Sequence, residues 1–158
     1  MTMSGAGRAG ALCCVLALAL AGCASTPQAT TGRDAEARQF LTHPGSATLY
    51  VYRNDLSSDM GDSDNVLYVD GRIIGATLPG TFFRVDVRPG THVLRGYGFD
   101  QGTLKVDTQS GALYFISLNV IGGTSHFRLV GPEAGKRMIQ ACCALLENWA
   151  PGQRPLLR

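Results

Sequence analysis

Two adjacent cysteines, Cys142 and Cys143, are candidates for reactive chemistry in the C-terminal part of this 158-residue chain. Neighbouring Cα atoms lie about 3.8 Å apart, which is below the usual disulfide range of about 4.4–6.8 Å. The sequence therefore favours two free thiols, with Cys142 buried in a helix and Cys143 at the edge of its apolar face. A redox or metal-binding pair and a vicinal or intermolecular disulfide are the alternatives, although no nearby His or Cys completes a metal-ligand set.

A polar segment gathers carboxylates around Gly61, and oxygen atoms are the ligands that Ca²⁺ prefers. The carboxylates belong to Asp55, Asp59, Asp62 and Asp64. Their spacing does not match the EF-hand loop, in which aspartates at alternate positions lead into a glycine. We therefore expect a solvated loop, and the sequence predicts neither a metal nor another cofactor.

The three histidines, His43, His92 and His126, lie in unrelated sequence contexts. The chain contains no nucleophile elbow, zinc-protease helix, phosphate-binding P-loop or dinucleotide fingerprint. Its 14 basic and 12 acidic side chains nearly balance, and Lys and Arg form no long run, which argues against nucleic acid as a partner. These features predict a protein that is not an enzyme.

The N-terminus carries the most specific chemical signal. A single arginine precedes the apolar run Ala11–Ala21, which is shorter than the about 20 residues of a membrane span and predicts a signal peptide over residues 1–22. Residues 20–23 read Leu-Ala-Gly-Cys, which resembles the bacterial lipobox. That resemblance implies cleavage between Gly22 and Cys23 and acyl chains on Cys23, which give stable membrane anchoring.

The residue after Cys23 is Ala24 rather than aspartate. By analogy with enterobacterial sorting, this favours the outer membrane of a Gram-negative bacterium, with the protein facing the periplasm. Residues 23–45 begin with small and polar side chains and include a proline, so we expect a flexible tether, with a short helix over Asp34–Leu41 that ends before Pro44.

The middle of the chain is rich in strand and turn signals. Ala47–Arg53 is apolar on both faces and predicts a central strand, while Thr81–Val87 alternates with a period of two. Asp70-Gly71 lies between two β-rich runs and predicts a two-residue type I′ turn. Pro89-Gly90 predicts a second turn. In later strands, we expect one face to hold Tyr114, Ile116, Leu118, Val120, Phe127 and Leu129.

Residues 132–150 predict a C-terminal amphipathic helix, because Pro132 suits a first turn and apolar residues recur at helical spacing. The apolar stripe consists of Met138, Ile139, Cys142, Leu145, Leu146 and Trp149. We expect this helix to pack on the face of the sheet that carries Tyr114 and Ile116. Residues 151–158 form a tail.

The order of these signals over residues 46–131 resembles the PEGA-type β-domain and, more closely, a family of bacterial lipoproteins of unknown function that carry such a domain. The family has no established activity, so the resemblance implies none. The matching positions are Tyr50, Tyr52, Arg53, Asp70, Gly71, Gly75, Phe83, Pro89, Gly90, His92 and the segment Gly111–Phe115.

Together these patterns predict a mainly β protein: a sandwich-like antiparallel β-domain of seven or eight strands with one C-terminal helix packed on it. The first functional hypothesis is a non-enzymatic envelope lipoprotein that binds an envelope protein or glycan. The second is a small-ligand-binding lipoprotein with a pocket on the β-domain, for which Tyr50, Tyr52, Arg53 and His92 are the candidate binding residues. We expect His92 itself to be packed and hydrogen-bonded.

Overall fold

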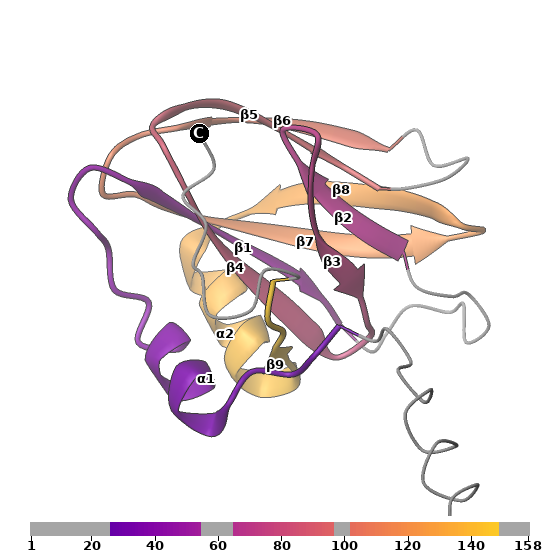
Figure 1. Cartoon of the computed structure of the whole chain (residues 1–158), viewed down its shortest axis with the longest axis horizontal. Helices are drawn as coiled ribbons and strands as arrows, with labels where there is room; N and C mark the ends of the chain where they lie inside the picture. Colours follow the sequence, from indigo (N-terminus) through magenta and orange to yellow (C-terminus); the bar gives the residue numbers. More distant parts are fainter. Residues whose placement is uncertain (1–25, 55–64, 97–101, 149–158) are drawn as a thin grey trace, which may run out of the picture.

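The computed structural model describes residues 26–54, 65–96 and 102–148, which form two helices and nine strands (Figure 1). The predicted signal peptide, Cys23, the aspartate-rich loop, Trp149 and the tail lie outside the described residues. The prediction of a mainly β, sandwich-like fold is confirmed, because the described strands form two sheets.

The larger sheet has five strands in the order β8-β7-β1-β4-β9. Their bounds are β1 Ala47–Arg53, β4 Thr81–Val87, β7 Leu113–Ile121, β8 Thr124–Val130 and β9 Ala144–Leu145. Strand β1 is central, as predicted, and all seven of its residues are buried. It pairs antiparallel with β4 but parallel with β7, and β9 also pairs parallel with β4. The predicted antiparallel arrangement therefore does not hold for these two pairs.

The smaller sheet has four antiparallel strands in the order β3-β2-β5-β6. Their bounds are β2 Asn65–Val69, β3 Arg72–Thr77, β5 Gly90–Arg95 and β6 Thr103–Thr108. The two sheets enclose the main core, which contains Phe83, Val85 and Val87 of β4 on the face that their alternation predicted. Gly75 of β3 leaves space for the Phe83 ring, because an added Cβ would lie 2.9 Å from its Cζ atom.

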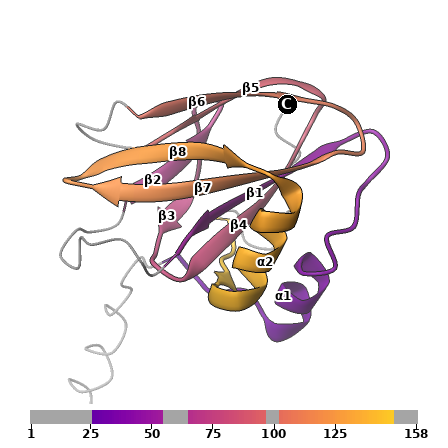
Figure 2. The ribbon, with the colours of Figure 1, turned by 180° about the vertical axis from the view of Figure 1, so that it is seen from behind.

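A second apolar cluster covers the opposite face of the five-stranded sheet, where two helices pack (Figures 1 and 2). These helices are α1 Thr31–Ala37 and α2 Pro132–Cys142. Helix α2 lies directly over Phe115 of β7, and an added Cβ at Gly135 would be only 2.4 Å from the Phe115 Cβ. The absence of a side chain at Gly135 therefore sets how closely the helix approaches the sheet.

The predicted docking face for the C-terminal helix is wrong. Ile116, Leu118 and Val120 point into the core between the sheets, whereas the helix packs on the face that carries Phe115. The face of β7 that carries Phe115 is also apolar at its start, at Leu113 and Phe115, so the alternation alone did not show which face the helix covers. In β8, Phe127 packs against the core as predicted, but Leu129 is 51% exposed.

The predicted helix over 132–150 is also too long, because α2 ends at Cys142 and Cys143 already has an extended backbone. Strand β9 follows, and the Leu146 amide donates to the Phe82 carbonyl of β4 at 2.9 Å. The extended backbone places Leu145 in the outer cluster and Leu146 in the core between the sheets. A continuous helix could not have placed these neighbours on opposite sides of the sheet.

Residues 26–30 are held against the domain, in contrast to the flexible tether predicted for residues 23–45. Thr26 is buried, and its hydroxyl accepts a 2.8 Å hydrogen bond from the amide of Ala76 in β3. The Ala29 amide donates to the Leu145 carbonyl at 2.9 Å, and the Glu147 amide donates to the Pro27 carbonyl at 2.8 Å. This segment therefore bridges one edge of each sheet.

Cys142 and Cys143 form a vicinal disulfide at the junction of α2 and β9. The prediction of free thiols is therefore wrong. The vicinal disulfide, which was one of the alternatives, is present instead. The bond closes the smallest possible loop between two cysteines, so it removes little chain entropy from the unfolded state.

The Asp70-Gly71 turn has the predicted backbone conformation, with φ values of +51° and +75°. We expect Gly71→Val to lower the free energy of unfolding by about 1–3 kcal/mol, because a β-branched residue is strained at positive φ. No atom would contact the added Cβ, so backbone strain is the only direct cost. Urea unfolding measures the effect, and Gly32→Val, where φ is not positive and no atom lies within 4 Å of an added Cβ, is the matched control. Equal urea midpoints for the two variants would contradict the assignment of the cost to the turn.

Candidate functional site

His92 is the candidate binding residue with the most specific surroundings. Its Nδ1 atom lies 2.6 Å from Oδ2 of Asp70, and its Nε2 atom lies 2.6 Å from the Arg88 carbonyl oxygen. The side chain is buried, and the other Asp70 carboxylate oxygen accepts a 2.8 Å hydrogen bond from the Val93 amide. The prediction of a packed, hydrogen-bonded histidine is confirmed.

This arrangement connects two turns that lie far apart in the sequence. Asp70 belongs to the β2–β3 turn, and Arg88 precedes the Pro89-Gly90 turn between β4 and β5. Both ring nitrogens of His92 are occupied, so neither is left to contact a substrate. The cluster therefore acts as a structural link between the hairpin and the following strand.

The other three candidate binding residues do not form one site. Tyr50 and Tyr52 lie on the helix-covered face of β1, whereas Arg53 donates to the Thr77 carbonyl of the other sheet at 3.2 Å. All three are at most 4% exposed. Burial raises the pKa of the Tyr52 phenol, against the lowering effects of the Arg128 charge and a hydrogen bond with Ser117. These side chains stabilise the interior and are closed to a ligand from solvent.

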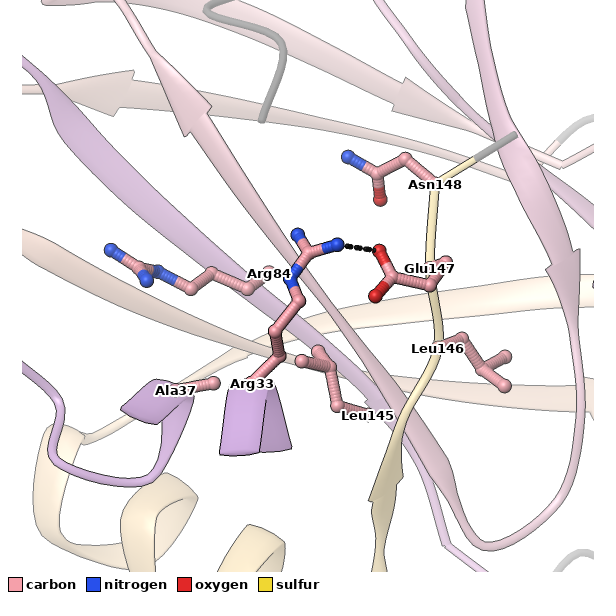
Figure 3. Close-up of a pocket in the computed structure, with 7 residues that line it drawn as sticks. All are labelled: Arg33, Ala37, Arg84, Leu145, Leu146, Glu147 and Asn148. Carbon is pink, nitrogen blue, oxygen red and sulfur yellow. Dashed lines mark hydrogen bonds and ion pairs between the residues drawn. The ribbon is translucent and has the colours of Figure 1, made fainter. Parts of the chain in front are cut away.

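A small polar pocket lies between α1, β4 and the C-terminal segment (Figure 3). Arg33 of α1 forms an ion pair with Glu147, while the Arg84 guanidinium points away from this pair. Arg84 instead contacts Nε2 of His43 at 2.6 Å and lies 3.7 Å from an Asp86 carboxylate oxygen. The pocket has a volume of about 20 Å³, which holds about one water molecule. It is therefore a polar junction rather than a ligand site.

Asp34 and Arg38 of the N-terminal segment hold the C-terminal segment in place. One Asp34 carboxylate oxygen accepts from the Leu145 amide at 2.7 Å, and the other accepts from Arg38 Nε at 2.5 Å. The Arg38 guanidinium also donates to the carbonyls of Ile139 and Cys143 and lies over the Phe82 ring. We call this Asp34–Arg38 group the terminal clasp.

Sequence reasoning missed the terminal clasp. The only signal available was an acid and an arginine four residues apart in a predicted helix, a spacing that lets two side chains meet on its surface. That spacing does not show that both side chains also bind the main chain more than 100 residues away.

We expect the terminal clasp to make the domain sensitive to acid. Burial raises the pKa of Asp34, but hydrogen bonds from Arg38 and the Leu145 amide, together with the Arg38 charge, hold it below its usual value of 3.8. The ionised carboxylate therefore stabilises the fold fully above that usual value, and this contribution disappears as the pH falls through the lowered pKa.

Urea unfolding of the wild type and of Asp34→Asn, from neutral pH to below the usual carboxyl pKa of 3.8, measures how much the ionised Asp34 contributes to stability. The variant should be less stable at neutral pH and should lose less stability on acidification. Glu133→Gln, at the exposed start of α2, is the control. Parallel acid profiles for wild type and Asp34→Asn would contradict the prediction.

A larger groove among the described residues is open and apolar, with a volume of about 330 Å³. It lies where β7 and β8 meet the start of α2 and has no charged side chain in its lining, which consists of Leu113, Tyr114, Leu129, Val130, Gly131 and Pro132.

Within the described ranges, no group of His, Cys, Asp and Glu side chains could hold a metal ion. No helix in those same ranges is long and apolar enough to cross a membrane.

The fold and these contacts define a small β-sandwich closed by its own N- and C-terminal segments. Residues 43–133 match the family described as "Protein of unknown function (DUF2846)", and the chain belongs to this family. An uncharacterized protein of Haemophilus influenzae is 32% identical over 130 residues, which cover 78% of this chain and 76% of that relative. No solved structure matches the chain. The family match begins after α1 and ends before β9, so the terminal clasp lies outside it.

Proposed function

We propose that this protein is a cell-envelope lipoprotein, anchored through acyl chains on Cys23, that binds an envelope protein or glycan without catalysing a reaction. The observation that carries the proposal is the Leu-Ala-Gly-Cys sequence at residues 20–23, directly after an apolar segment. Thr26, three residues later, is buried in the β-sandwich. We place the protein in the outer membrane, facing the periplasm, because Ala24 rather than aspartate follows the cysteine.

Two features argue against a catalytic or small-ligand site at the candidate residues. Both ring nitrogens of His92 are occupied by structural partners. The buried Tyr50, Tyr52 and Arg53 are likewise used inside the domain. Of the two cavities described above, only the groove beside α2 is large enough for a small ligand, and its lining lacks the convergent polar groups that orient most ligands.

We expect Cys23→Ser to abolish acylation and to leave an uncleaved precursor, since the thiol is the group that accepts the lipid. Metabolic labelling with a radioactive fatty acid, followed by intact-mass measurement, tests this expectation. Cys14→Ser is the matched control, because it changes a cysteine inside the predicted signal peptide and should leave labelling unchanged. Labelling that persists in Cys23→Ser would reject the lipoprotein proposal.

The binding role is tested with the wild-type protein recovered from its own envelope. We expect the tagged protein either to retain one envelope protein after cross-linking or to sediment with purified peptidoglycan. Cys23→Ser, with the same domain but with an uncleaved signal peptide in place of the acyl chains, shows whether retention depends on acylation. A protein that retains no partner and does not sediment with peptidoglycan would contradict the binding role.

A further inference from the structure

The point at which the chain enters the sandwich is fixed by several contacts. Thr26 is 5% exposed and accepts the hydrogen bond from the Ala76 amide on the outer edge of β3. The next residues pair with the segment around Leu146 beside the other sheet. The chain from Thr26 onward therefore cannot serve as a spacer without breaking these contacts.

Only three residue steps separate Cys23 from Thr26. A fully extended chain spans at most about 3.3–3.6 Å per residue, so these two Cα atoms lie within about 11 Å of one another. The headgroup layer of a bilayer is about 5–8 Å thick on each side of its hydrocarbon core. An acylated Cys23 at the base of that layer therefore leaves only a few ångströms between the lipid and Thr26.

Building on the proposed acylation, we propose that the sandwich lies directly on the lipid headgroups, with the outer edge of β3 against the membrane. This edge is the one that Thr26 contacts, and it carries the exposed side chains of Arg72 and Ile73. Ile73 is 49% exposed although it is apolar. An apolar side chain beside an arginine suits the boundary between acyl chains and phosphate groups.

This placement predicts that different parts of the surface lie at different distances from the lipid. Leu41 is as apolar and as exposed as Ile73, at 56%, and it lies in the connection between α1 and β1. Figures 1 and 2 show this connection and β3 on opposite sides of the molecule. Leu41 is therefore the matched control position for Ile73.

The test uses the full acylated protein purified from membranes, as Ile73→Cys or Leu41→Cys with a thiol-linked fluorophore. The disulfide of Cys142 and Cys143 and the thioether of Cys23 leave the introduced cysteine for labelling. Each protein is placed in vesicles of phosphatidylethanolamine and phosphatidylglycerol that carry a headgroup quencher. We expect several-fold stronger quenching at position 73 than at position 41.

A 20-residue Gly/Ser insertion between Ser25 and Thr26 is expected to remove this difference, since such a linker extends to about 25 Å. Equal quenching at the two positions without the insertion, or an unchanged difference with it, would overturn the membrane-seated arrangement. Mass measurement of the same samples distinguishes failure of this placement from failure of the lipoprotein proposal. Acylated protein with equal quenching rejects this placement alone, whereas protein without acyl chains rejects the lipoprotein proposal and the placement with it.

Discussion

A chain that stops after Gly131 is expected to aggregate rather than to form a soluble β-domain. The truncation removes α2, which packs on the outer face of the five-stranded sheet, and β9, which forms one edge of that sheet. Tyr50, Phe82 and Phe115 are at most 1% exposed in the complete fold, and each aromatic side chain buries about 150–250 Å². Loss of Ile139 and Leu145 uncovers part of the cluster that contains these aromatic side chains, and an exposed apolar patch of this kind promotes aggregation.

The same truncation leaves β4 without its partner β9, so a sheet edge becomes available for pairing with another chain. Size-exclusion chromatography and binding of a hydrophobic dye measure the outcome. A stop after Asn148 is the control, because it retains every described residue and should give a soluble protein. A truncated chain that remains monomeric and as stable as this control would show that α2 and β9 are not part of the core.

Phe115→Ala is expected to lower the free energy of unfolding by about 3–5 kcal/mol. The Phe115 ring is fully buried, stacks on Tyr50 with a centroid distance of 5.1 Å, and meets the edge of Phe40 at 5.7 Å. The backbone at Gly135 packs directly over it. Removing the ring therefore leaves a cavity between a sheet and a helix, both fixed by other contacts.

Urea unfolding measures this loss. Ile121→Ala is the control on the same strand, because Ile121 is 55% exposed and its truncation creates no cavity. A loss below about 1 kcal/mol in Phe115→Ala, similar to that of a surface substitution, would contradict the central role of Phe115 in attaching α2 to the sheet.

Features set by short-range chemistry could be predicted from the sequence. The Asp70-Gly71 turn follows from the backbone freedom of its two residues, and Thr81–Val87 follows from strict alternation. The central position of Ala47–Arg53 follows from two apolar faces, which only a strand covered on both sides can bury. The hydrogen-bonded state of His92 was also predictable, although its partners were not.

Features set by long-range pairing could not be predicted in this way. Leu145 and Leu146 fit the apolar stripe of a helix as well as a strand. The strand forms because main-chain groups of β4 and of residues 27–29 are available to pair with this segment. The apolar pattern of β7 is similarly ambiguous, because Phe115 and Ile116 are both fully buried on opposite faces. The terminal clasp adds side-chain contacts to distant main-chain groups, which sequence spacing does not encode.

The pairing of residues 27–29 with residues 145–147 also has a kinetic consequence. These contacts join positions separated by almost the whole described chain, and such pairs must meet the entropic cost of closing a long loop before they contribute. A ribosome has to synthesise the chain through Glu147 before residues 27–29 find their partners. Completion of the fold is thus a late event, and until then the edge of β4 that pairs with β9 stays open to chaperones.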